Sequence, residues 1–281
     1  MIHGLPILGI DFSGDHSKWS ARCSNSNVWI AQGLLRSETI SLQKLQRVQG
    51  LAGRGDPFQR LSNLLNSEVA GVAAIDAPFS LPAENVNDAP EKIWLACRRL
   101  ACDGRAFCRG SDLVQTFAPE LGARGKKLLR ETERYWQGRR VNVRSTTWSG
   151  PRGGAPFAAA CMTLLSLHKG AVWPLTDHPS EAKMTLVEAF PAAQLRHWEL
   201  PYVKYNGATE TEHNQRAIII EGLKRKGLVA ASEDDIDLCR NSADALDAVI
   251  CLFAAAAFAR GRLAVMPGAS SRAEGHIAVH E

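Results

Sequence analysis

The chain has 281 residues, 45% hydrophobic and 22% charged, and its formal net charge is +4. These values are ordinary for a soluble globular protein and allow a full core. No apolar run approaches the roughly 18–20 residues that span a bilayer, and no basic region precedes the short apolar run near the N-terminus. We therefore expect a cytoplasmic protein without membrane association.

The first apolar run ends at a single carboxylate, Asp11, and small turn-forming residues follow it. Short apolar runs of this length predict a buried strand, here over residues 7–12, with the acid at the rim of a sheet. Two more strands are expected over residues 18–23 and 28–34. Their close spacing predicts an antiparallel meander.

A second acid-bearing strand is expected over residues 71–76, where an apolar run leads into Asp76. Apolar residues at helical spacing predict helices over residues 41–48 and 57–65 in between. A right-handed crossover through such helices makes the two acid-bearing strands parallel. Asp76 and the acid of the first strand then lie at the same end of the sheet, where ligands bind in open α/β sheets.

A third strand of this kind is expected over residues 184–188, and it delivers Glu188. The sequence thus predicts a mixed five-stranded sheet in a single α/β domain, 1–281. A large insertion, about 80–183, separates the fourth and fifth strands. It includes an apolar helix over residues 157–168, and it is expected to cover the rim of the sheet.

Basic residues concentrate within this insertion, between Arg124 and Arg144. Such a segment either meets phosphates or forms a solvated loop or helix face, and charge alone leaves both interpretations open. The basic residues are Arg124, Lys126, Lys127, Arg130, Arg134, Arg139, Arg140 and Arg144.

Two helices are expected after the last strand, over residues 214–226 and 243–259. The second is apolar on nearly every side, which predicts burial against the sheet. Asp244 and Asp247 are three residues apart and share a face at its start. Asp244 alone is equally explained as a helix-start residue. Asp247 is expected to be largely buried and to need a metal or a cationic partner.

Five acids from distant segments are therefore expected to converge. Each has a structural alternative: turn hydrogen bonds for Asp11 and Asp76, and an arginine partner for Glu188. Together they favour a divalent metal site, because clustered carboxylates repel unless they are protonated or metal-bound. Oxygen ligands select magnesium or manganese, and two such ions about 3.5–4 Å apart can promote phosphodiester hydrolysis.

The seven cysteines are scattered and odd in number, which fits reduced thiols. Cys97, Cys102 and Cys108 lie close in sequence but contain no C-x-x-C pair and have no matching histidine pair downstream. We therefore favour ordinary thiols over a zinc site.

Six short segments carry a resemblance to a known family. They are Gly9-Ile10-Asp11-Phe12-Ser13-Gly14, Ile75-Asp76-Ala77-Pro78, Arg130-Glu131-Thr132-Glu133-Arg134, Glu188-Ala189-Phe190-Pro191, Asp244-Ala245-Leu246-Asp247-Ala248 and Glu274-Gly275-His276-Ile277. Over nearly its whole length the chain resembles a domain-of-unknown-function family of predicted nucleases with an RNase H-like fold. The last segment has His where the family pattern has Trp.

The resemblance implies a three-layer α/β/α core and a site like that of Holliday-junction resolvases, with two Mg²⁺ or Mn²⁺ ions. By position, the catalytic and metal-binding acids would be Asp11, Asp76, Asp244 and Asp247, with Glu188 as a further metal ligand. Arg130 or Arg134 would hold the phosphate. Ser13, in the turn after the first strand, is a further candidate for a substrate contact.

Two other functions remain possible at this stage. An ATP-dependent phosphotransferase of the actin and sugar-kinase type shares the core. However, Ser13 occupies the glycine position of its first loop, and no second Gly-rich loop or second core is evident. A non-catalytic nucleic-acid-binding protein on the same fold is the other alternative, although a binder of polyanions gains nothing from clustered carboxylates. The type of nucleic acid and the oligomeric state are not predicted.

Overall fold

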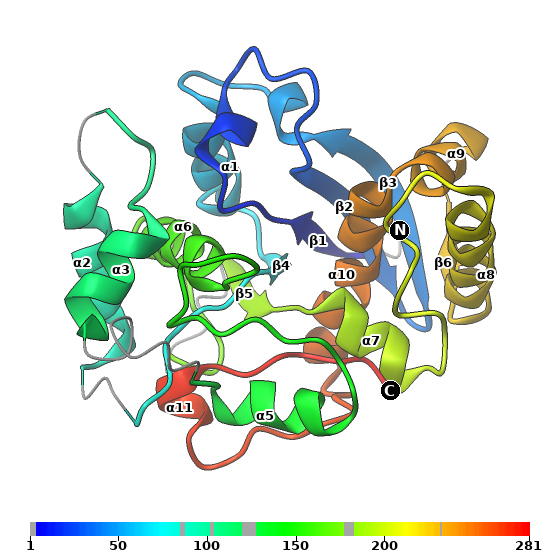
Figure 1. Ribbon diagram of the computed structural model, residues 1–281. Coiled ribbons are helices and arrows are strands. Elements are labelled where there is room, and N and C mark those ends of the chain that lie inside the picture. Colours follow the sequence, from blue (N-terminus) through cyan, green and yellow to red (C-terminus); the bar gives the residue numbers. More distant parts are fainter. Residues whose placement is uncertain (1–3, 85–87, 102–103, 120–127, 177–182, 231) are drawn as a thin grey trace.

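A mixed sheet forms the centre of the computed structural model, which describes residues 4–84, 88–101, 104–119, 128–176, 183–230 and 232–281. Within these ranges the sheet has six strands in the order β5-β4-β1-β2-β3-β6 (Figure 1), one more than predicted. The strands are β1 (Leu5–Asp11), β2 (Trp29–Arg36), β3 (Thr39–Arg47), β4 (Gly71–Asp76), β5 (Met184–Glu188) and β6 (Leu228–Val229).

The predicted helix over residues 41–48 is wrong, because this segment is strand β3. Leu42 and Leu45 are both buried and three residues apart, which imitates helical spacing. The cause is an irregularity in the pairing with β2, in which Gln32 pairs with Lys44 but the next residue pairs with Leu42. The extra residue at this bulge places two leucines three apart on one face of the sheet.

The predicted strand over residues 18–23 is also wrong. A short 3₁₀ helix, η1 (His16–Trp19), occupies its start, and turns follow. Trp19 is buried, and its indole N–H donates to the carbonyl oxygen of Ser13 at 2.8 Å. The segment is therefore tied to the turn that follows β1 instead of extending the sheet.

Helices pack on both faces of the sheet (Figure 1). Alternate residues of β1 point to opposite faces, as strand geometry requires. Ile7 packs with α10 and α8, whereas Leu8 and Ile10 pack with α1 and α6. The helices are α1 (Pro57–Leu65), α2 (Pro90–Leu100), α3 (Gly110–Phe117), α5 (Glu131–Gly138), α6 (Ala155–Leu165), α7 (Pro191–His197), α8 (Glu210–Arg225), α9 (Glu233–Asn241), α10 (Ala243–Arg260) and α11 (Ser271–Glu274). A second short 3₁₀ helix, η2 (Val48–Gly50), precedes α1.

Several predictions about the elements are confirmed. β4 pairs in parallel with β1, and α1 lies in the connection between β3 and β4. Helices α6, α8 and α10 lie within a few residues of their predicted positions. The C-terminal tail makes an isolated bridge to β5, in which the Ala278 amide donates to the Glu188 carbonyl at 2.8 Å.

No single helix in the described ranges is long and apolar enough to cross a membrane. Helices α9 and α10 reach such a length and composition only as a pair, and they are bent by 116° relative to each other. Most of α10 is buried inside the protein.

Close packing of α10 on β1 depends on Gly9. A Cβ atom at this position would overlap the Ala248 carbonyl oxygen and lie 2.7 Å from the Leu252 nitrogen. Both neighbours are backbone atoms of α10, so they cannot move aside as a flexible side chain can.

We expect Gly9→Ala to lower the free energy of unfolding by about 1–3 kcal/mol, because overpacking displaces α10. Gly33→Ala is the matched control. Its added Cβ would meet the side chains of Ile7 and Leu252 and the Ser41 carbonyl oxygen only at 3.3–3.4 Å, close to ordinary van der Waals contact. Urea denaturation of both variants tests this expectation, and equal losses of stability would contradict it.

Candidate functional site

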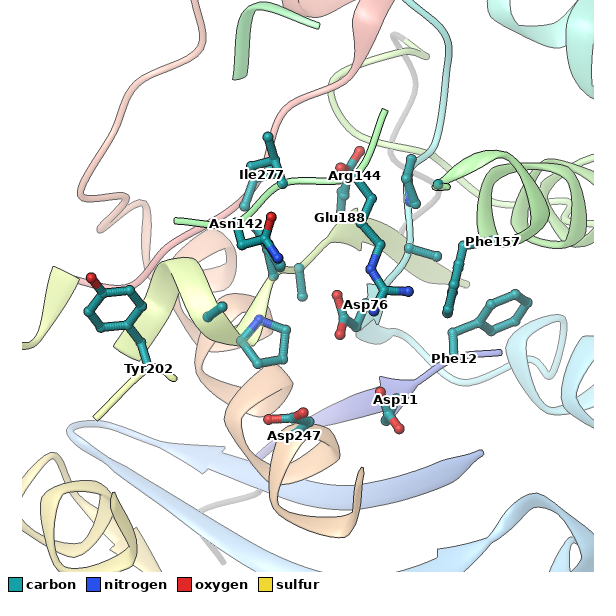
Figure 2. A pocket seen from close by; sticks show the side chains of 18 of the residues that line it. Asp11, Phe12, Asp76, Asn142, Arg144, Phe157, Glu188, Tyr202, Asp247 and Ile277 are labelled. Carbon is teal, nitrogen blue, oxygen red and sulfur yellow. The ribbon is translucent and has the colours of Figure 1, made fainter. Parts of the chain in front are cut away.

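All five predicted acids line one cavity of about 510 Å³ at the carboxyl ends of β1 and β4. Asp11 and Asp76 are register partners on these parallel strands, so their predicted placement at one end of the sheet is confirmed. Asp244 and Asp247 come from the first turns of α10. Figure 2 shows Asp11, Asp76 and Asp247 around the same space. Two strands and one helix thus bring their carboxylates together.

Burial and mutual repulsion disfavour negative charge on these acids. Burial raises the pKa of Asp11 well above its usual range, and the charges of Asp247, Asp76 and Asp244 raise it further. Burial and then the charge of Glu188 raise the pKa of Asp76 to about 7, although Arg144 opposes this shift. The pKa of Asp247 is raised well above its usual range by burial and by Asp76.

Asp244 lies in the first turn of α10 but does not cap this helix. The Ser242 side chain caps the helix by accepting from the Ala245 amide at 3.2 Å, so Asp244 is not needed as a cap. Burial raises the pKa of Asp244, and the charges of Arg47 and Lys18 lower it. Asp244 therefore lies at the cationic side of the cluster.

The partner that Asp247 was expected to need is a tyrosine hydroxyl. Tyr205 donates to Asp247 Oδ1 at 2.9 Å and is itself buried. The buried guanidinium of Arg216 donates to the backbone carbonyls of Tyr205 and Gly207, and to that of Arg240. Arg216 thus fixes the segment that presents Tyr205 to the acid. Sequence reasoning missed this pair, because nothing in the polar segment before α8 distinguishes Tyr205.

Glu188 has a different environment from the four acids. It pairs with Ile75 in the sheet, one residue before Asp76, so its side chain points to the other face. Arg130 donates to its two carboxylate oxygens at 2.5 and 2.7 Å, and the Phe79 amide donates at 3.1 Å. Glu188 thus lines the cavity and also has the arginine partner that was the alternative to metal binding. Its role as a metal ligand stays a prediction.

Arg130 also lines the cavity, but its side chain is engaged by the protein. It is 1% exposed, and its guanidinium donates to Glu188, Glu133 and the Glu274 carbonyl. With its donors committed to these buried acceptors, it joins α5 and the C-terminal tail to β5. The structure gives Arg130 a buried ion pair, and a phosphate contact at this residue stays a prediction.

Arg134 and Ser13, in contrast, do not line the cavity. Arg134 is exposed on α5 and pairs with Glu84 at 2.9 Å. Ser13 is buried, and its hydroxyl accepts from the Asp15 amide at 3.2 Å within its own turn. A substrate contact at either residue stays a prediction.

A cation from the predicted basic segment does reach the acids. Arg144 is exposed and lines the cavity, and Figure 2 shows its guanidinium extending toward Asp76. Sequence reasoning included it in the basic segment but did not select it, since charge alone does not show which arginine faces the acids. Arg124, Lys126 and Lys127 lie outside the described residues.

The acids share a cavity, but their side chains are not already spaced as the ligands of a metal ion. Within the described part of the chain, no three His, Cys, Asp or Glu side chains are already spaced as metal ligands. Cys97 and Cys108 are buried free thiols, and Cys102 lies outside the described residues.

We expect Arg130→Met to lower the free energy of unfolding by about 3–5 kcal/mol, because it leaves Glu188 and Glu133 buried without their cation. Arg134→Ala is the control, and loss of its exposed pair should cost less than about 1 kcal/mol. Chemical denaturation of both variants measures the difference. A stable Arg130→Met protein would overturn the structural role.

Comparisons with known proteins identify a family but no characterised relative. No curated protein and no solved structure matches the chain. One family model matches residues 9–272, which include every acid of the cavity. The chain therefore belongs to the family described as "Protein of unknown function (DUF429)".

Proposed function

We propose that this protein is a metal-dependent nuclease that hydrolyses phosphodiester bonds of nucleic acid with two Mg²⁺ or Mn²⁺ ions. The observation that carries the proposal is the convergence of Asp11, Asp76, Asp244 and Asp247 in one cavity. We further propose an RNase H-like core. The meander β1–β2–β3 with the parallel strands β4 and β5 beside it supports this assignment.

The residues of the cavity fit a hard divalent cation. Carboxylate oxygens are the ligands that magnesium and manganese prefer. The cavity is also lined by Asn27, whose buried Oδ1 atom has no hydrogen-bond partner among the described residues. The metal is therefore proposed from donor chemistry and crowded negative charge, and not from a preformed ligand geometry.

The chain's own residues have distinct roles in this proposal. Asp11, Asp76, Asp244 and Asp247 would hold the ions, and Tyr205 would keep Asp247 oriented through its hydrogen bond. Bound ions would supply Lewis acidity and an activated water at phosphorus. Arg144 would contact the phosphate, in place of the arginines expected from the sequence. No side chain is required as a nucleophile.

A non-catalytic nucleic-acid-binding protein is less well supported. Such a protein gains affinity from cations, and buried carboxylates oppose phosphate binding. Several acids held together in one cavity lower the stability of the fold unless a bound cation balances their charge.

The test is cleavage of labelled single-stranded, duplex, hybrid and branched nucleic acids in magnesium or manganese. We expect Asp76→Asn to reduce cleavage by at least about 100-fold, because catalysis by a metal site requires intact ligands. Asp234→Asn, at an exposed position on α9, is the matched control and should retain activity. Chelator should abolish cleavage by the wild type. No cleavage of any substrate, together with no metal binding by calorimetry, would overturn the proposal.

The pKa of Asp76 also predicts how stability depends on pH. It is about 7 in the folded protein and about 3.9 in an unfolded chain. Between these values the folded state binds more protons, so stability falls as pH rises from roughly 4 to 7.

We therefore expect the metal-free protein to lose thermal stability between about pH 5 and pH 7.5, and Asp76→Asn to lose less. Added Mn²⁺ should stabilise the wild type more at the higher pH, because it binds ionised carboxylates. Thermal melts with and without chelator measure both effects. An identical pH dependence in the wild type and Asp76→Asn would contradict this assignment.

A further inference from the structure

The geometry points to a flexible single strand of nucleic acid as the substrate, with one nucleotide unit seated in the cavity and its base stacked on Phe157. This inference rests on the proposed function, since it names the substrate of the same site. It adds an aromatic recognition residue, and it excludes an intact duplex.

The acids lie on the floor of the cavity and not on an open face of the protein. Asp11 is 7% exposed. The segment around Arg144 and the first turn of α6 form one wall, and residues 202–206 form another. A volume of about 510 Å³ falls within the range of small-ligand pockets. It suits one nucleotide better than a turn of rigid double helix.

Arg144 and Phe157 form a paired contact surface on one wall. The Arg144 guanidinium carbon lies 5.3 Å from the centre of the Phe157 ring. Figure 2 shows Phe157 on one side of the Arg144 side chain and Asp76 on the other. A phosphate at Arg144 would therefore have an aromatic face next to it. Basic groups alternating with aromatic faces are the usual means of binding single strands without reading their sequence.

Phe157 is held firmly in this position. It lies in the first turn of α6, where the backbone of Pro156 and Phe157 packs against Gly14 so closely that a Cβ there would overlap it. Phe12, which follows Asp11 directly, is 2% exposed and lines the same cavity. The turn after β1 therefore fixes both the acid and the aromatic wall. Phe157 itself is half-buried and keeps part of its ring available.

The charge of the protein also argues against duplex binding. Its sequence pI is about 8.7 and its net charge only +4. Two of the arginines that contribute to this charge, Arg130 and Arg216, are buried and engaged by protein acceptors. Domains that hold duplexes usually have a pI above about 9 and a broad basic surface.

The test measures binding and cleavage separately. Binding is followed by fluorescence anisotropy with the full-length Asp76→Asn protein in magnesium, which suppresses cleavage. The probes are a labelled ten-nucleotide single strand, as DNA and as RNA, and a duplex of the same sequence. Phe157→Ala, Phe157→Leu and Phe157→Tyr are introduced in the same background.

Tyr135→Ala is the matched control. Tyr135 is also half-buried beneath an arginine, with the Arg139 guanidinium carbon 3.6 Å from its ring centre, but it does not line the cavity.

We expect the single strand to bind at least tenfold more tightly than the duplex. Phe157→Ala and Phe157→Leu should weaken single-strand binding by roughly 5- to 100-fold, the range of one lost base stack. Phe157→Tyr and Tyr135→Ala should bind like the parent. Phe157→Leu keeps an apolar side chain, so it decides the result if Phe157→Ala does not fold.

Equal or tighter binding of the duplex, unchanged binding by Phe157→Leu, or no binding of any probe would overturn the inference. Failure of the proposed function would give a different combination of binding and cleavage results. If the single strand binds through Phe157 but the wild type cleaves nothing with either metal, the binding inference stands and the nuclease does not. If the wild type cleaves duplex in preference to single strands, the nuclease stands and this inference fails.

Discussion

The buried ion pair between Arg130 and Glu188 is the interaction that joins the parts of this structure. Its two short hydrogen bonds connect the insertion to the end of β5. The same arginine donates to the backbone of Glu274, and the Thr132 hydroxyl accepts from the Ile277 amide. Three sequence-distant segments therefore meet at one guanidinium. Buried pairs of this kind add little net stability over an apolar alternative, but they are costly to break singly.

This arrangement separates two kinds of acid that look alike in sequence. Glu188 is neutralised by a partner on one face of the sheet. Asp11 and Asp76 face α10 at the end of the next two strands, where the partner found for Asp247 is a neutral hydroxyl. The first kind stabilises contacts between segments. In the second kind, burial and mutual repulsion disfavour the negative charge that a bound cation would favour. Gly9 lets the helix that carries Asp247 approach closely enough to complete the cluster.

Much of the sheet and the acid cluster was predictable from the sequence, because short apolar runs that end in an acid identify buried strands and their rims. The apolar pattern of α10 was similarly informative. Residues 41–48 were not predictable by periodicity, since a bulge in the pairing with β2 moved Leu42 and Leu45 onto one face. That irregularity depends on the neighbouring strand and leaves no local signal.

The roles of the arginines also could not be predicted from the local sequence. Arg130, Arg134 and Arg144 share one charge and one basic segment, yet one is buried, one is paired on the surface and one faces the acids. Only the tertiary positions of Glu188, Glu84 and Asp76 distinguish them. The same is true of Tyr205, whose role depends on α10 and on the Arg216 contacts.

The contact between Arg130 and Glu274 also has a consequence for biosynthesis. The two residues are 144 positions apart in the chain. At ordinary rates of translation, on the order of 10 s separates their appearance. In the later part of that interval a nascent chain has made the arginine and its glutamate partner on β5, 58 positions further on, but not the tail that completes their surroundings. The insertion therefore docks fully only late in synthesis, and an emerging chain needs its apolar surfaces protected until then.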